Sequence, residues 1–478
     1  MTIPDIRKRW LALYVLCLAS LMIVLDATIV NVALPSIKED LGFTQSSLAW
    51  VVNGYLLTYG GFLLLGGRLG DLYGPRRWFI AGIALFTLAS LACGLAQSQG
   101  FLIAARTVQG LGGAAASAVS LALVMSLFTE HGDRAKAMGL FGFVSAGGGS
   151  IGVLLGGVLT NYLDWHWIFL VNLPIGVLVV VLSLRLLPGG AGRGTGKLDV
   201  AGALTVTTAL MLAVYGVVNA QQKGWTSAHT FGFLGAAVAI FVLFLVIESK
   251  VSAPLMPLRL FRLHNLAVAN SVGILWAAAM FAWFFLSSLY LQLVLHYSAL
   301  QIGLSFLPAN VIMAVFSVGL SAKLVMRFGF RKPLGAGLLL AAAGMALFVR
   351  APVDGNFLVD VLPSMVLLGF GAGMAFNPVL LAAMSDVDPQ ESGLASGIVN
   401  TAFMMGGALG LAVLASIAAS RTQALADGGA AQSHALLGGY HLAFLLGAIF
   451  ALIAAGLGAF LLRERHVAPH GAPVPEAA

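Results

Sequence analysis

Charged side chains are scarce in this sequence of 478 residues. Asp, Glu, Lys and Arg together make up 9% of the chain, whereas a soluble domain has about 25%. Hydrophobic residues make up 60%. This composition excludes an ordinary soluble domain and predicts a polytopic membrane protein.

Patterns that carry catalysis or bind metals are also lacking. The two cysteines, Cys17 and Cys93, lie in apolar runs and predict no disulfide framework. The nine histidines lack metal-ligand spacing, and no nucleophile–base pair stands out. Residues 191–198 approach a phosphate-binding loop but lack its first Gly and the Ser or Thr after Lys197. We therefore expect no enzyme, no metal and no organic cofactor.

Apolar runs long enough to cross a bilayer recur along the chain, and none alternates like a barrel strand. They predict an all-α polytopic membrane protein with fourteen transmembrane helices. The runs lie at about residues 10–34, 48–67, 79–96, 101–127, 137–160, 167–187, 199–219, 229–248, 266–293, 299–324, 334–350, 357–384, 393–419 and 440–462.

The positive charges indicate the orientation of these spans. With both termini in the cytoplasm, 20 of the 25 Lys and Arg fall in cytoplasmic segments, four fall outside, and Arg106 lies within a span. This bias follows the positive-inside rule. It accounts for the net charge of +7 without nucleic acid and predicts contacts with anionic lipid.

The two halves of the chain are weakly repeated. GRLGDLYGPRR (67–77) follows the second span, and AKLVMRFGFRK (322–332) follows the tenth with the same Gly-x-Arg-basic ending. Parallel half-repeats are typical of transporters, with the binding site between the halves near the membrane midplane.

This repeat predicts the domain organisation. We expect six-helix bundles at 1–187 and 265–462, with a linker and an inserted transmembrane pair at 188–264 between them. Residues 463–478 are expected to form a disordered cytoplasmic tail.

Asp26 places a carboxylate deep inside the first apolar run. An ionised group there costs at least about 2.5 kcal/mol, so such residues usually face a bundle interior or a wet cavity. A group that is costly when ionised and cheap when protonated is suited to carry protons. The alternative is a structural Asp held by Thr28 or Asn31.

Arg106 is the only basic residue that lies more than two residues inside the ends of a predicted span, and Gln109 shares its helix face at i+3. A buried guanidinium needs a partner and stabilises the ionised form of a nearby carboxylate. Arg106 is therefore expected to respond to protonation of Asp26. The alternatives are a static buried ion pair and an arginine that extends to the membrane surface.

A tight cytoplasmic turn after the second span carries charges of both signs. A carboxylate in such a turn can bridge to a neighbouring helix or to basic side chains, giving a latch that one conformation makes and another breaks. The alternative is a solvated hairpin. The predicted latch residues are Asp71, Arg76, Arg77, Gly67 and Gly74.

The fifth predicted span is rich in glycine. Small residues on one face allow close helix contact, which predicts a seam that moves during alternating access; the alternative is ordinary packing. The seam residues are Gly139, Gly148, Gly152, Gly156 and Gly157.

Aromatic and amide side chains within the spans are candidates for a substrate cavity. A pocket with few charges suits lipophilic or cationic substrates, because cations also gain from aromatic faces. The candidates are Asn31, Tyr55, Tyr59, Gln109, Trp283, Phe284 and Phe376.

Taken together, these motifs resemble the major facilitator superfamily, specifically its fourteen-span drug:proton antiporter branch (EmrB/QacA-like). The resemblance covers nearly the whole chain. Its motifs are LDATIVNVALPSI (25–37), GRLGDLYGPRR (67–77), RTVQGLGGA (106–114), the span-five glycines, DWHWIFLVNLPIG (164–176) and GLASGIVNTAFMMGGALG (393–410).

The resemblance implies a major facilitator fold and proton-coupled efflux of lipophilic or cationic drugs by alternating access. The protein would be multi-pass in the bacterial inner (plasma) membrane, powered by the proton gradient, with a periplasmic adaptor as a further partner. It implies that Asp26 couples to protons, that Arg106 assists the transfer, and that Asp71 belongs to the latch.

Three positions depart from the branch pattern. Val153 replaces the usual Pro of the fifth-span motif, His166 stands where Arg is common, and Met326 takes the place of Asp71 in the second-half loop. Two other functions stay open. One is a dedicated exporter of a single endogenous metabolite or antibiotic, and the other is a membrane receptor or scaffold that transports nothing.

Overall fold

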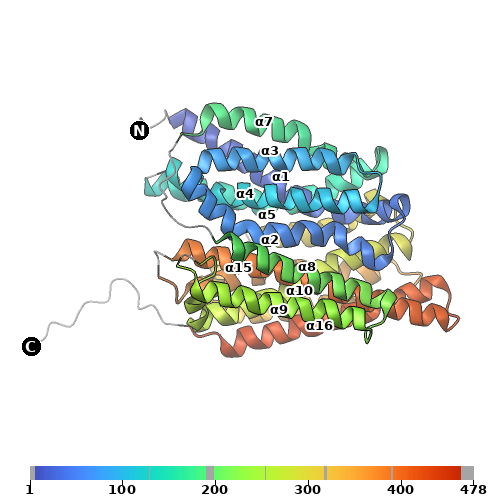
Figure 1. Ribbon diagram of the computed structural model, residues 1–478. Helices are drawn as coiled ribbons and strands as arrows, with labels where there is room; N and C mark the ends of the chain where they lie inside the picture. The colour runs from blue at the N-terminus through green and yellow to red at the C-terminus, as the bar shows by residue number, and fades with distance from the viewer. Residues whose placement is uncertain are drawn as a thin grey trace, which may run out of the picture.

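The computed structural model describes residues 6–128, 130–189, 199–252, 254–316, 320–388 and 391–464. Within these ranges the regular structure is entirely helical. The helices run roughly along one direction in a single bundle (Figure 1). Their bounds are α1 (Ile6–Leu41), α2 (Gln45–Tyr73), α3 (Pro75–Gly94), α4 (Gln99–Leu127), α5 (His131–Tyr162), α6 (Trp167–Leu170), α7 (Asn172–Leu186), α8 (Val200–Lys223), α9 (Ala228–Lys250), the 3₁₀-helix η1 (Leu258–Arg262), α10 (His264–Leu293), α11 (Ala299–Val315), α12 (Ser321–Phe328), α13 (Arg331–Phe348), the π-helix η3 (Phe357–Val361), α14 (Leu362–Met384), α15 (Ser392–Asp427) and α16 (Gln432–Leu461).

The apolar runs fold as helices because only a helix pairs all of its backbone groups within one segment in a lipid environment. In the described residues, eleven helices are long and apolar enough to cross a membrane. The predicted all-helical membrane fold is therefore confirmed. The predicted runs at 137–160, 299–324 and 334–350 lie on α5, α11 with α12, and α13, which are not among the eleven. A total of fourteen spans stays a prediction.

The helices pack as two groups. In the first half α1 packs against α5 and α7, and α4 packs against α2 and α3; in the second half α10 packs against α15 and α16, and α13 against α14. The halves meet where α5 contacts α11 and where α2 contacts α15. Helices α8 and α9 pair with each other, and α8 also contacts α2 and α15. The predicted domain organisation, with its inserted helix pair and its boundaries, stays a prediction.

Two segments of the predicted organisation lie outside the described residues. They are most of the linker, at 190–198, and the tail from 465 onward. In the part that is described, α1 begins and α16 ends at the same end of the bundle, on the left in Figure 1.

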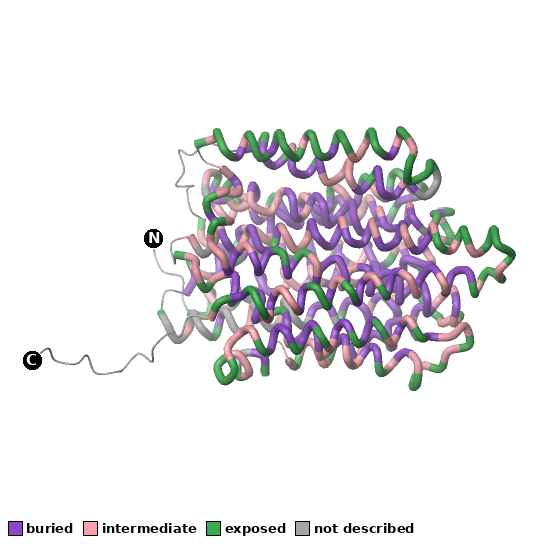
Figure 2. Tube along the Cα trace, turned by 90° about the horizontal axis from the view of Figure 1, so that it is seen from below, coloured by how far each residue is buried: buried purple, intermediate pink, exposed green. Residues whose placement is uncertain are grey.

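Burial follows the bundle geometry. Buried positions fill the interior, and exposed positions lie along the helices at the margin (Figure 2). Many exposed side chains are large and apolar, among them Leu88, Phe231 and Val238, which are 65%, 62% and 63% exposed. Such a surface is stable in lipid and unfavourable in water.

Glycine lets α3 and α4 approach each other closely. A Cβ on Gly112 would lie 2.5 Å from the backbone nitrogen of Phe86, and a Cβ on Gly82 would lie 2.6 Å from that of Ala116. No side chain fits at either crossing point. Because lipid chains are as apolar as the helices, this close van der Waals contact is a main source of helix association.

The Gly112 contact predicts an asymmetric response to alanine. Gly112→Ala should lower the free energy of unfolding by about 1–3 kcal/mol, because its new methyl group overlaps the α3 backbone. Gly100→Ala on the same helix is the matched control, since nothing lies within 4 Å of its Cβ position. Thermal unfolding of the detergent-purified protein measures both. Equal midpoints for the two variants would contradict this account of the packing.

Candidate proton-coupling site

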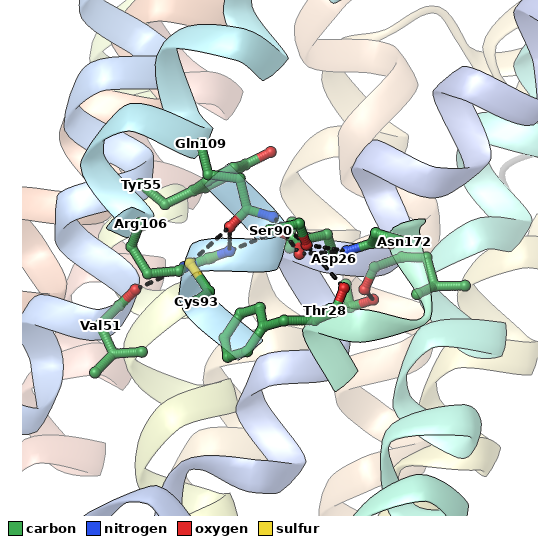
Figure 3. Close-up of polar contacts among 12 residues, drawn as sticks. Asp26, Thr28, Val51, Tyr55, Ser90, Cys93, Arg106, Gln109 and Asn172 are labelled. Carbon is green, nitrogen blue, oxygen red and sulfur yellow. Dashed lines mark hydrogen bonds and ion pairs between the residues drawn. The ribbon is translucent and has the colours of Figure 1, made fainter. Parts of the chain in front are cut away.

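Asp26 lies on α1 with its carboxylate closed off from solvent, at 0% exposure. Three side chains donate to it. Arg106 Nη1 lies 2.5 Å from Oδ2, Gln109 Nε2 lies 2.8 Å from Oδ1, and Asn172 Nδ2 lies 2.9 Å from Oδ1. Figure 3 shows these donors converging on the acid from α4 and α7. The site thus ties three helices of the first half together.

Local sequence explains how the donors reach the acid. Arg106 and Gln109 are three residues apart on α4 and so project from one face. Asn172 is the first residue of α7, and Val171 separates it from the short helix α6. Helix α7 can approach α3 because Gly176 has no side chain; its Cβ would lie 1.9 Å from Thr87 Oγ1.

A second layer of contacts fixes the donors. Ser90 Oγ accepts from Gln109 Nε2 at 3.1 Å and from Asn172 Nδ2 at 3.0 Å, and it donates to the Phe169 carbonyl at 2.9 Å. Each amide therefore bridges the acid and the hydroxyl of Ser90. Such shared bonds hold the amide orientation and thereby the position of the carboxylate.

The guanidinium of Arg106 is itself held on several sides. Its Nε donates to the Val51 carbonyl at 3.1 Å, and its Nη1 donates to Gln109 Oε1 at 2.7 Å. Its central carbon lies 4.4 Å from the centre of the Tyr55 ring, a cation–π contact. Arg106 is 1% exposed, so it is a buried ion-pair partner of Asp26 and does not extend to the membrane surface.

Asp26 acts only as a hydrogen-bond acceptor in this conformation. An ionised carboxylate only accepts hydrogen bonds, and all three side chains that contact it act as N–H donors. A proton on either oxygen needs an acceptor instead. Protonation of Asp26 therefore requires at least one of Arg106, Gln109 and Asn172 to move or rotate.

The glycine face of α5 packs on the helix that carries Asp26. Cβ atoms on Gly152 and Gly156 would lie 2.8 Å from the carbonyl oxygens of Leu25 and Ile29, one on each side of Asp26 along α1. Gly148 faces the same helix one turn earlier. The predicted close contact is therefore present, and its partner is α1.

The other side of α5 faces the second half. A Cβ on Gly157 would lie 2.8 Å from the carbonyl oxygen of Ala299 on α11, and one on Gly303 would lie 3.0 Å from that of Val153. Helix α5 runs without a break through Val153, where the branch pattern has proline. The surroundings of Gly139 lie outside the described residues.

The predicted latch residues lie around the turn between α2 and α3. Gly74 has φ +96°, a conformation that side chains rarely adopt, and its N–H donates to the Gly70 carbonyl. Arg76 donates to the carbonyl of Leu184 near the end of α7, within the first half. Arg77 is exposed, and a Cβ on Gly67 would lie 4.0 Å from Ala118 Cβ. The side chain of Asp71 lies outside the described residues.

The seven predicted cavity residues do not gather in one place. Gln109 and Tyr55 belong to the Asp26 site, and Tyr59 stacks on Tyr55 with ring centres 5.7 Å apart. The carbonyl of Asn31 accepts from Ser288 Oγ of the second half at 2.5 Å.

The remaining three cavity candidates lie in the second half. Trp283 and Phe284 pack with Phe306 in a buried cluster. Phe376 is 48% exposed and has its ring against Phe403. Their role in substrate binding stays a prediction.

Two members of the site were not identified from the sequence. Ser90 and Asn172 are uncharged and lie in apolar runs, where a hydroxyl or an amide is common. The one available signal was for Asn172, which lies within the DWHWIFLVNLPIG motif.

Comparison with known families identifies the kind of protein that carries this site. A model of the Major Facilitator Superfamily matches residues 16–411, most of the chain. The chain belongs to the Major Facilitator Superfamily. It is therefore a multi-pass membrane transporter and not an enzyme.

Individual relatives of this superfamily member are resistance and export proteins. The chain is 40% identical over 472 residues to the puromycin resistance protein pur8 of Streptomyces alboniger, covering 97% of this chain and 93% of that protein. It is 39% identical over 415 residues to the cephamycin export protein CmcT of Amycolatopsis lactamdurans, covering 86% and 85%.

A solved structure supports the major facilitator fold. The crystal structure of a bacterial homolog of the human lysosomal transporter Spinster, inward-facing and unoccupied, is similar with a TM-score of 0.65. The sequence identity is 15%, and the match covers 95% of this chain and 97% of the other.

The ion pair predicts strongly non-additive effects on stability. Arg106→Leu should cost about 3–5 kcal/mol, because it leaves a buried carboxylate without its cation. Adding Asp26→Asn should recover a large part of that loss, since the amide carries no charge. Thermal unfolding of both single variants and the double variant measures the coupling, and Arg327→Leu at an exposed position is the control. Additive losses would show that the two side chains do not act as a pair.

Proposed function

We propose that this chain is a proton-coupled exporter of lipophilic small molecules, including cationic ones, in which Asp26 binds and releases the driving proton. The observation that carries the proposal is the buried Asp26–Arg106 ion pair between α1 and α4. Helix α1 also packs on α5, the helix that contacts the second half. An ionisable group inside a transporter bundle is by default a functional group. The resistance and export roles in the names of the two relatives support the direction of transport.

The proposed cycle follows from the donors around Asp26. A proton arriving from the outer side neutralises Asp26, which then releases Arg106 and needs an acceptor. Asn172 Oδ1 is buried and has no hydrogen-bond partner among the described residues. Rotation of the Asn172 amide would present this oxygen to the new O–H group. The proton leaves on the inner side, and the ion pair forms again.

Movement at Asp26 can reach the second half through α5. Gly152 and Gly156 contact α1 beside Asp26, and Gly157 contacts α11. On the predicted topology, the α5–α11 contact at Gly157 and the Ser288–Asn31 hydrogen bond lie toward the outer side. The conformation described here would then be closed to the outside, with Asp26 ionised. Arg76, Arg77 and Asp71 would form or break the cytoplasmic latch in the other conformation.

The proton gradient is the proposed energy source. One charge crossing 100 mV is worth about 2.3 kcal/mol, which supports roughly a fifty-fold gradient of a neutral substrate. If the proton exchanges for a monovalent cation, the membrane potential cancels and the pH gradient alone drives export.

We also propose a finer classification of the protein. It would have fourteen spans and belong to the drug:proton antiporter branch, and it would lie in the bacterial inner membrane with both termini in the cytoplasm. Contacts with anionic lipid and with a periplasmic adaptor are proposed as well. The positive-inside charge distribution supports the orientation.

A dedicated exporter of one antibiotic or metabolite is the second candidate. The two relatives are each named for a single compound or compound class, puromycin and cephamycin. Expression in a drug-sensitive bacterium, with and without a protonophore, separates the candidates. Resistance to many lipophilic compounds supports the first, and resistance to one chemical class supports the second.

Replacing Asp26 with Asn tests the coupling directly. In proteoliposomes, addition of ethidium or puromycin should drive proton movement with the wild-type protein and should fail to do so with Asp26→Asn. Glu39→Gln is the matched control, because Glu39 lies on the same helix and is exposed. Unchanged proton movement in Asp26→Asn would refute the proposed role of this residue.

Gly157 tests the contact between the halves. Gly157→Val should oppose closure of α5 on α11 by about 1–3 kcal/mol, which is roughly a 5- to 150-fold change in the equilibrium population of this conformation. We expect transport to slow while the unfolding midpoint stays unchanged, because this contact joins the two halves and not the interior of one. Gly149→Ala is the control, since its Cβ position has an ordinary contact of 3.6 Å. Wild-type transport rates in Gly157→Val would exclude a role for this contact.

A further inference from the structure

The pair of helices α8 and α9 holds two buried carboxylates close to where α8 begins and α9 ends. Asp199 caps α8, with Oδ1 accepting from the Gly202 N–H at 2.7 Å. Glu248 lies in the last turn of α9, with Oε2 accepting from the Met256 N–H at 3.1 Å. The two residues are 3% and 4% exposed.

The remaining oxygens of these two acids meet at Gly202. Asp199 Oδ2 lies 2.5 Å, and Glu248 Oε1 2.9 Å, from the point that a Cβ on Gly202 would occupy. Both oxygens are buried, and neither has a hydrogen-bond partner among the described residues. Two ionised carboxylates placed so near each other and away from water repel strongly. One proton between them turns this repulsion into an O–H···O hydrogen bond.

The surroundings of the pair are largely apolar. A small buried apolar cluster lies beside it and consists of Leu65 of α2, Ala203 of α8 and Leu255. Leu255 belongs to the connector, residues 254–263 between α9 and α10. An apolar environment disfavours two negative charges and favours a pair that carries one proton.

Nearby cations do not neutralise the pair in the described part of the chain. Arg68 on α2 and Lys250 on α9 are exposed, and neither forms an ion pair there with Asp199 or Glu248. Arg259 of η1 pairs instead with Glu391, which precedes α15. Two further cations, Arg193 and Lys197, precede Asp199 and lie outside the described residues, so the experiment must include them.

We propose that Asp199 and Glu248 form a second proton-binding site, at the base of the α8–α9 pair, in which the two carboxylates share one proton. The proton comes from water and forms one O–H bond; when it leaves, it returns to water and no other covalent bond changes. The site is built by residues other than those around Asp26, and the inference does not depend on the direction of transport.

Occupancy of this site should control the connector to the second half. One oxygen of the Glu248 carboxylate, Oε1, faces Asp199, and the other, Oε2, accepts from the Met256 N–H in the connector. Loss of the proton makes the two acids repel, which weakens the hold on residues 254–263. Gain of the proton secures the connector.

Infrared difference spectroscopy and hydrogen exchange test the proposal on the full-length protein in nanodiscs. The wild type should show a protonated-carboxyl band that titrates with pH and is lost in both Asp199→Asn and Glu248→Gln. Exchange at 254–263, corrected for its intrinsic pH dependence, should rise about tenfold per pH unit as the shared proton leaves. Either amide variant should flatten this rise, because an amide cannot ionise.

Two controls keep the test specific. Glu391→Gln breaks the Arg259 ion pair and should speed exchange in the connector at every pH without changing the infrared band. Asp26→Asn should leave both the band and the pH dependence of the connector in place. If either amide variant fails to fold, the wild-type exchange titration still decides the question.

Three results would overturn the proposal. One is the absence of a titrating carboxyl band assigned to Asp199 or Glu248. Another is a connector whose exchange does not depend on pH in the wild type. The third is a carboxyl band of Asp199 and Glu248 that titrates only in the double variant Arg193→Ala/Lys197→Ala. That result would show that these two cations neutralise the acids in the wild type.

Discussion

A charge inside a lipid-embedded bundle must find its compensation within the protein, and the Asp26–Arg106 ion pair is organised by that constraint. Neither side chain can form hydrogen bonds to bulk water, because Asp26 is 0% exposed and Arg106 is 1% exposed. The desolvation cost of such a pair is several kcal/mol per ion and is offset only when the remaining hydrogen-bonding groups are also satisfied. The amides of Gln109 and Asn172, the hydroxyl of Ser90 and the Val51 carbonyl meet that need. Five helices, α1, α2, α3, α4 and α7, are thereby held together around a single carboxylate.

The two charged members of the site could be predicted because charged residues are so rare in the sequence. A membrane protein with one acid deep in its first apolar run and one arginine inside a span has few ways to pair them, and the structure joins Asp26 to Arg106. The helices were equally predictable, because in lipid the backbone N–H and C=O groups of a span must pair within the protein, and a helix pairs them within one segment. Asn172 and Ser90 were missed because neutral polar groups are cheap enough in a span to carry no signal. Their importance arises only from where the helices place them.

The sequence also did not predict which helices pack against one another. The glycines of α5 predict close contact, but every neighbouring run is similarly apolar, so sequence spacing does not distinguish α1 from α11 as the partner. The structure assigns Gly152 and Gly156 to α1 and Gly157 to α11. Helix α5 therefore has glycine contacts on two sides, and it connects the helix that carries Asp26 with the boundary between the halves. The α8–α9 pair shows the same limit: Asp199 and Glu248 are far apart in sequence, and they come together at Gly202 because α8 and α9 form a helix hairpin.

Cys93 gives the molecule a built-in chemical reporter. Its sulfur lies 3.6 Å from Gln109 Oε1 inside the Asp26 cluster, and the residue is fully buried. The other thiol, Cys17, is buried as well. A water-soluble alkylating reagent therefore meets no accessible thiol in the conformation described here. The rate at which Cys93 is modified in the unaltered chain would measure how often the interior around the acid becomes wet, without any engineered label.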